Sequence, residues 1–217
     1  VRRRGADPAP ERRAPALTRL NPVRHQRWNK RREQAKKLRR EAVIGIPRVL
    51  NMYSYGPFFS AYFQALGIPS FNIVFSDVTS EAMWREGSRR GSIDQCFPSK
   101  VALAHVHQLL TGVRKKPDII FFPIFTTLLT ELENVLDSCA CPTVAGTPQV
   151  VKAAFTKEGD SFAQAGARYY DPVLSFAEPE LFEHQLLAFA GPALDVTESE
   201  NEHAIRQGYR ALDRFRS

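Results

Sequence analysis

Several features that mark common classes of protein are missing from this sequence of 217 residues. No apolar run approaches the roughly 20 residues that cross a bilayer, because the longest, from Ile119 to Phe125, is interrupted by Pro123. The first residues are rich in Arg and hold no apolar segment, so we expect no secretory signal. The motif GxxxxGK[ST] is absent and no Gly-x-Gly-x-x-Gly follows a predicted strand, which argues against an ATP site in this chain.

Cysteine is scarce. The three cysteines, Cys96, Cys139 and Cys141, are an odd number without the spacing of a disulfide scaffold, so we expect reduced thiols and a cytoplasmic location. His105 and His107 lie two residues apart on a predicted helix and face different sides, which makes them a poor metal pair. The sequence also lacks a Gly-x-Ser-x-Gly nucleophile elbow.

Charge is present but unevenly spread. The net charge is +7, yet residues 1–42 carry +11 and residues 43–217 carry −4. We therefore divide the chain into a basic leader, 1–42, and a folded domain, 43–217. Four prolines predict irregular structure over 1–23, and 24–42 is interpreted as a solvated helix or a tether. Nucleic-acid binding by the leader is disfavoured, since Trp28 is its single aromatic residue.

From residue 43 onward, short apolar runs alternate with segments of helical periodicity. This alternation predicts an α/β fold with a mainly parallel sheet flanked by helices and a helical C-terminus. The predicted strands cover 43–46, 71–75, 118–122 and 143–145, and after residue 163 the strand signal fades. The predicted helices cover 57–66, 81–86, 100–111, 130–138, 147–155, 179–189 and 198–215.

In such a sheet, ligands gather beyond the carboxyl ends of the strands. The segments expected there are 47–55, 123–127 and 146–148, joined by 94–100, which enters a helix starting near Pro98. Cys96 then lies just before a helix N-terminus, where the dipole and free N–H groups favour a thiolate. The candidate lining side chains of this site are Tyr53, Tyr55, Ser99 and Lys100, although core or capping roles explain them as well.

Cys139 and Cys141 form the second cysteine site, in the string Cys139-Ala-Cys-Pro142. A cysteine followed by proline is typical of iron–sulfur ligands, although the dipeptide has little specificity. The pattern alone favours buried, reduced cysteines, leaves a metal or cluster site open, and disfavours a cramped disulfide between Cys139 and Cys141.

Three strings resemble the activase-related domain of the CoA-substrate-specific enzyme activase family. They are Ile44-Gly-Ile-Pro-Arg-Val-Leu-Asn-Met-Tyr53, Asp94-Gln-Cys-Phe-Pro-Ser-Lys100 and Cys141-Pro-Thr-Val-Ala-Gly-Thr-Pro148. The resemblance covers about residues 43–190. That domain, of unknown function, occurs in very large bacterial proteins after actin-like ATPase modules, and it is similar to subunits of 2-hydroxyacyl-CoA dehydratases.

The resemblance implies a flavodoxin-like or Rossmann-like fold and a [4Fe–4S] cluster. By that analogy Cys96 and Cys141 are the expected cluster ligands, with Cys139 as a candidate third. Since a cluster needs more ligands than two, the chain is expected to be a fragment, or the cluster to be completed between subunits, for example in a homodimer. The implied partners are actin-like ATPase activase modules or dehydratase and reductase subunits.

These expectations leave two alternative hypotheses for the function. The first is an iron–sulfur electron-transfer domain that serves the dehydration or reduction of acyl-CoA substrates. The alternative is a non-catalytic docking domain of a larger activase complex, with buried thiols and no enzymatic activity of its own.

Overall fold

The computed structural model describes residues 14–19, 21–87, 96–130, 132 and 138–217. A four-stranded sheet lies at its centre, in the order β2-β1-β3-β5, and every pair of neighbouring strands is parallel. The strands are β1 (Ile44–Ile46), β2 (Ile73–Phe75), β3 (Ile119–Phe121) and β5 (Arg168–Tyr170). The predicted α/β fold with a mainly parallel sheet is confirmed.

Two further parallel strands, β4 (Ile124–Thr127) and β6 (Val173–Ser175), prolong β3 and β5. Pro123 and Pro172 separate them from the main sheet, because proline has no N–H to donate to a ladder. The backbone nevertheless stays paired across this point: the Phe122 N–H donates to the Tyr170 carbonyl, and the Ile124 N–H donates to the Pro172 carbonyl, each at 2.9 Å.

The expectation that 123–127 is a loop beyond a strand was therefore wrong. The pairing offset between the two chain segments is the same before and after the prolines, so β3 and β4 act as one interrupted strand. The carboxyl edge of the sheet at this position lies beyond Thr127.

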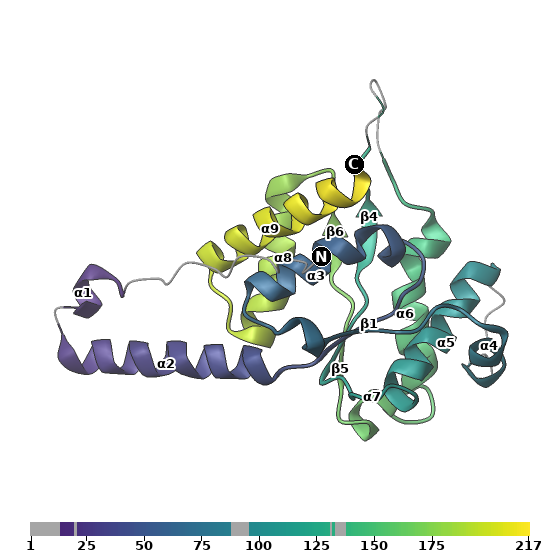
Figure 1. Cartoon of the computed structure of the whole chain (residues 1–217), viewed down its shortest axis with the longest axis horizontal. Helices are drawn as coiled ribbons and strands as arrows, with labels where there is room; N and C mark the ends of the chain where they lie inside the picture. Colours follow the sequence, from purple (N-terminus) through teal and green to yellow (C-terminus); the bar gives the residue numbers. More distant parts are fainter. Residues whose placement is uncertain (1–13, 20, 88–95, 131, 133–137) are drawn as a thin grey trace.

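Helices cover both faces of the sheet (Figure 1). On one side lie α3 (Met52–Ala65), α8 (Pro179–Leu194) and α9 (Glu198–Arg216), and on the other lie α4 (Glu81–Gly87), α5 (Phe97–Thr111) and α6 (Pro142–Thr156). Shorter segments are α1 (Ala16–Arg19), α7 (Ser161–Gln164) and a 3-10 turn, Ser70–Asn72. The predicted helical C-terminus is confirmed by α8 and α9.

Aromatic side chains of α3 fill the core between the sheet and α9. Phe58, Phe59 and Phe63 are fully buried, and Phe58 meets the ring of Phe176 edge-on at 5.3 Å. Gly208 of α9 permits this close packing, because a Cβ there would lie 2.6 Å from the Phe58 ring. Burial of these Phe side chains contributes about 1.5–3 kcal/mol each to the stability of the fold.

The strand predicted over 143–145 was wrong, because these residues lie in the first turn of α6. Cys141 is the N-cap and Pro142 is the first helical residue, a position where the missing N–H costs nothing. The Thr147 hydroxyl donates to the Thr143 carbonyl at 2.7 Å within this helix. The helix predicted over 130–138 falls mostly outside the described residues.

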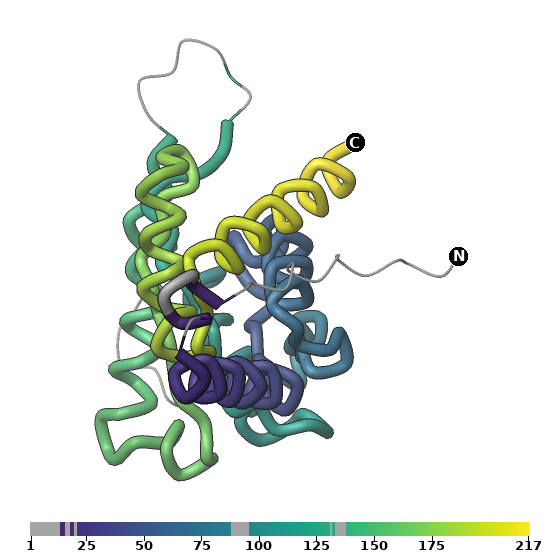
Figure 2. Tube along the Cα trace, turned by 90° about the vertical axis from the view of Figure 1, so that its left-hand side faces the viewer, coloured from purple at the N-terminus to yellow at the C-terminus, as the bar shows by residue number. Residues whose placement is uncertain are grey.

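The basic leader contains α2 (Pro22–Glu41), which confirms its helical character. The expectation that it is fully solvated was wrong for one face: Arg39 is 2% exposed and pairs with Glu200 of α9 at 3.1 Å. Arg32 pairs with the same carboxylate, and Arg31 pairs with Asp195 at 3.0 Å. Figures 1 and 2 show α2 beside the segment that joins α8 and α9.

Among the described helices, none combines the length and the apolar character needed to cross a membrane.

Candidate functional site

Cys96 lies just before a helix, as predicted, and is the N-cap of α5. The helix starts at Phe97, one residue before the predicted start. The Cys96 thiol is exposed, and its Sγ lies 3.3 Å from the Oγ of the fully buried Ser99. The pKa of Cys96 is lowered, first by the Ser99 hydroxyl and then by the Ser99 backbone N–H, which both stabilise the thiolate.

Cys141 has the same setting at the start of α6. It is the exposed N-cap of a 15-residue helix, and its pKa is lowered by the backbone N–H groups of Val144 and Thr143. These N–H groups belong to the first turn, where no helical carbonyl is available to accept them. The end of the helix thus favours a negative sulfur at this position.

The fold brings these two N-caps to the same edge. Helices α5 and α6 pack against each other, and a negative charge on Cys141 acts to raise the pKa of Cys96. Helix α5 leads into the parallel strand β3 and helix α6 follows the parallel strand β4, so both begin toward the carboxyl edge of the sheet. The juxtaposition could not be derived from sequence spacing, because the two residues belong to different strand–helix units.

Cys139 also lies at this edge, but in a different setting. Its backbone forms an antiparallel bridge with Thr127, the last residue of β4. Its thiol is exposed, as are those of Cys96 and Cys141, so the expectation of buried cysteines was wrong.

A family model supports the resemblance seen in the sequence. The model of the CoA enzyme activase uncharacterised domain matches residues 43–217. The chain belongs to this family. The match begins where the basic leader gives way to the acidic part of the chain, so α2 lies outside it. Neither the curated proteins nor the solved structures gave a match.

The cysteines of this activase-family domain supply the donor type that an iron–sulfur cluster requires. Two thiols with lowered pKa face solvent beside two helix N-termini, which suits ligands of an anionic cluster. Within the described ranges, however, no three His, Cys, Asp or Glu side chains gather as a metal site. The donor chemistry therefore fits, while the number of ligands that this part of the chain brings together is too small.

The other side chains expected at the site have different roles. The Tyr55 hydroxyl accepts the Leu129 N–H at 2.9 Å and so joins α3 to the chain beyond β4. Tyr53 is 48% exposed at the start of α3. Ser99 supports the Cys96 thiol, and Lys100 is half-buried in the first turn of α5.

His105 forms a buried polar link that no pattern in the sequence predicted. Its Nδ1 lies 2.7 Å from the Ser76 hydroxyl and its Nε2 lies 2.9 Å from the Thr79 hydroxyl. Ser76 in turn accepts the Arg48 N–H at 2.7 Å, so the imidazole joins α5 to the ends of β1 and β2. His107 faces Glu86 instead, at 3.9 Å. The two histidines do point to different sides, as predicted.

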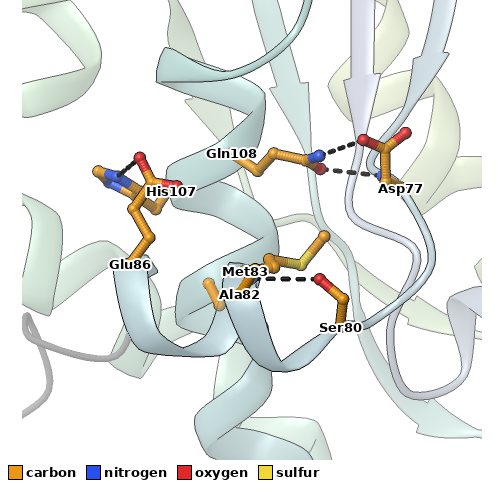
Figure 3. A pocket seen from close by; sticks show the side chains of 8 residues that line it. Asp77, Ser80, Ala82, Met83, Glu86, His107 and Gln108 are labelled. Atoms are coloured by element: carbon orange, nitrogen blue, oxygen red, sulfur yellow. Dashed lines mark hydrogen bonds and ion pairs between the residues drawn. The ribbon is translucent and has the colours of Figure 1, made fainter.

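A shallow cavity of about 170 Å³ lies between α4 and α5 (Figure 3). The Gln108 amide donates to the Asp77 carboxylate at 2.5 Å, and its oxygen accepts the Asp77 N–H at 2.9 Å. The Ser80 hydroxyl accepts the Met83 N–H at the start of α4. The Gln108 bonds join α5 to the segment before α4, while the Ser80 bond is local to the start of α4, and we interpret the cavity as a packing gap.

Proposed function

We propose that this activase-family domain is an iron–sulfur-binding electron-transfer domain, with Cys96 and Cys141 as ligands of a [4Fe–4S] cluster. The observation that carries the proposal is that two exposed thiols, each with a lowered pKa, are the N-caps of two helices that pack against each other. When bound, such a cluster supplies one-electron transfer at low potential.

The chain's own residues would act by holding thiolates. The Ser99 hydroxyl and the first-turn N–H groups of α5 and α6 stabilise negative sulfur, which is the form that binds iron. Membership of the CoA enzyme activase family supports acyl-CoA dehydration or reduction as the process that receives the electron. Its source would be a reduced actin-like ATPase module, and the receiver a dehydratase or reductase subunit.

Anaerobic reconstitution of the full chain with iron and sulfide tests the proposal. We expect protein-bound iron and the visible absorbance of a cluster, both lost in the double variant Cys96→Ser, Cys141→Ser. A matched control is Ser60→Ala, on the helix α3 away from the thiols. Equal iron in the parent and the double variant would contradict the proposal and favour a docking domain without a cluster.

A further inference from the structure

The amino edge of the sheet, where the parallel strands begin, carries a cluster of cations. Arg40 lies in the last turn of α2, just before β1, and Arg114, Lys115 and Lys116 lie between α5 and β3. All four residues are exposed, and Phe71, in the 3-10 turn before β2, is 73% exposed. We call these five residues the basic edge. Segments that are far apart in the sequence thus present one positive surface with an apolar ring in it.

Asn72 holds three of these residues in place. Its side chain is nearly buried, and its Nδ2 donates to the Arg40 carbonyl at 2.9 Å. Its Oδ1 accepts the Lys115 ammonium, whose Nζ lies 4.8 Å from the centre of the Phe71 ring. The lysine is therefore fixed over the aromatic ring, in the geometry of a cation–π contact.

The charge of the basic edge is not neutralised within the described residues. No carboxylate there forms an ion pair with Arg40 or with the three cations that precede β3. The two neighbouring acids are engaged elsewhere: Glu41 pairs with Lys37 at 3.8 Å, and Asp118 accepts the Val43 N–H at 2.8 Å. A local positive surface therefore remains on a domain, 43–217, that carries −4 overall.

We propose that the basic edge is a docking surface for another protein, one that presents several carboxylates around an exposed apolar side chain. The carboxylates would face the four cations, and the apolar side chain would cover the Phe71 ring. Aromatic residues are enriched at protein interfaces, and the charges around them set the choice of partner and the rate of association.

A nucleic acid fits this surface less well. Proteins that bind single strands offer several aromatic rings on which successive bases stack. The basic edge offers one ring, and Lys115 lies over one of its faces. A long polyanion would also extend across a domain of net negative charge, whereas a compact acidic protein surface meets only the local positive charge.

A partner at the basic edge would leave the exposed thiols open. Cys96 caps the start of α5 and Lys115 follows its end, so the two residues are separated by a 15-residue helix, about 22 Å long. The docking surface is therefore independent of the proposed function, and either can fail without the other.

Fluorescence anisotropy with the full chain tests the docking surface. The probe is a labelled peptide of glutamates around one central leucine. Two comparison probes are the same peptide with serine in place of leucine and a single-stranded uridine oligonucleotide of equal charge. We expect the leucine peptide to bind more tightly than both. Equal or tighter binding of either comparison probe overturns the proposal, and the oligonucleotide result would assign the surface to nucleic acid.

Variants locate the binding. In Arg114→Glu, Lys116→Glu we expect the affinity for the leucine peptide to fall by roughly tenfold or more, because repulsion replaces attraction. The matched control Arg27→Glu, Lys30→Glu changes the net charge equally, in the half of α2 that lies away from β1, and should have a clearly smaller effect (Figure 1). Phe71→Ser is expected to weaken the leucine peptide severalfold and to leave the serine peptide unchanged. Equal losses in the two charge-reversal variants would mean a general attraction to cations and would overturn the docking surface.

Discussion

Ser99 gives Cys96 a property that solvent exposure alone does not provide. A buried hydroxyl 3.3 Å from the sulfur is held in place by packing, so it is ready to stabilise the thiolate before any metal arrives. The string Cys-Phe-Pro-Ser-Lys predicted a helix starting near Pro98, just after this cysteine, since proline is tolerated in the first turn. The position of the Ser99 side chain, in contrast, depends on tertiary packing that no local pattern encodes.

His105 makes the stability of the fold depend on pH. Its pKa is lowered from 6.5 to about 4, mainly by burial and then by the charge of Arg48, while Asp77 acts in the opposite direction. Between about pH 4 and pH 6.5, His105 is mostly protonated in the unfolded chain and mostly neutral in the folded chain. The stabilising contribution is therefore complete above about pH 6.5 and is lost as the pH falls toward 4.

We expect the His105→Gln variant to lose this part of the pH dependence. Between about pH 7.5 and about pH 5, the free energy of unfolding of the parent should fall by about 2 kcal/mol more than that of the variant. Urea unfolding followed by far-UV circular dichroism measures both. His184→Gln is the matched control, since that side chain is exposed. If the parent and His105→Gln lose equal stability on acidification, His105 is not the group responsible.

At the scale of elements, the sequence predicted helices better than strands. The amphipathic pattern of 198–215 identified α9 almost to the residue, since a 19-residue helix repeats its signal many times. The strands β5 and β6 have three residues each and are separated by Asp171 and Pro172, so their pattern is too short to detect. These two strands become apparent only from their backbone pairing with β3 and β4, which continues across Pro123 and Pro172.

Glu200 connects the helices α2 and α9, between which the sequence predicted no contact. Its carboxylate accepts the Thr197 N–H at 2.9 Å, which completes the capping box of α9, and it also accepts Arg32 and Arg39 from α2. The pKa of Glu200 is lowered by the Thr197 N–H and by the two guanidinium groups, which together outweigh the effect of burial. A single buried carboxylate thus attaches the leader helix, which lies outside the family match, to the domain.

Replacing this carboxylate should release α2. In Glu200→Gln the nearly buried Arg39 loses its counter-charge, and leaving a charge buried and unpaired costs about 3–5 kcal/mol unless the group moves into water. Because α2 can move away from the body, we expect much faster tryptic cleavage within 22–41 while 43–217 stays intact. Lys37→Gln is the control, since its pair with Glu41 is exposed on both sides. Unchanged cleavage in Glu200→Gln would mean that other contacts, such as the Arg31–Asp195 pair, are enough to hold α2.

At the scale of the whole molecule, the net charge of +7 combines two parts of opposite sign. Part of the leader's positive charge is used inside the molecule, where Arg31, Arg32 and Arg39 face Asp195 and Glu200. This reduces the share of the leader that is available to bind an anionic partner. The sequence predicts the division of charge between the leader and the domain. It does not predict these ion pairs, because Glu200 lies 161 residues from Arg39 along the chain.

Binding of a cluster would also change the thermal stability of the domain. A ligand that binds the folded state and not the unfolded state raises the melting temperature. We expect the reconstituted protein to melt at a higher temperature than the iron-free protein, and the double variant Cys96→Ser, Cys141→Ser to show no such increase. Differential scanning calorimetry under anaerobic conditions measures both. An equal increase in the parent and in the double variant would show that iron stabilises the fold without these two thiols, because a ligand held by them cannot act in their absence.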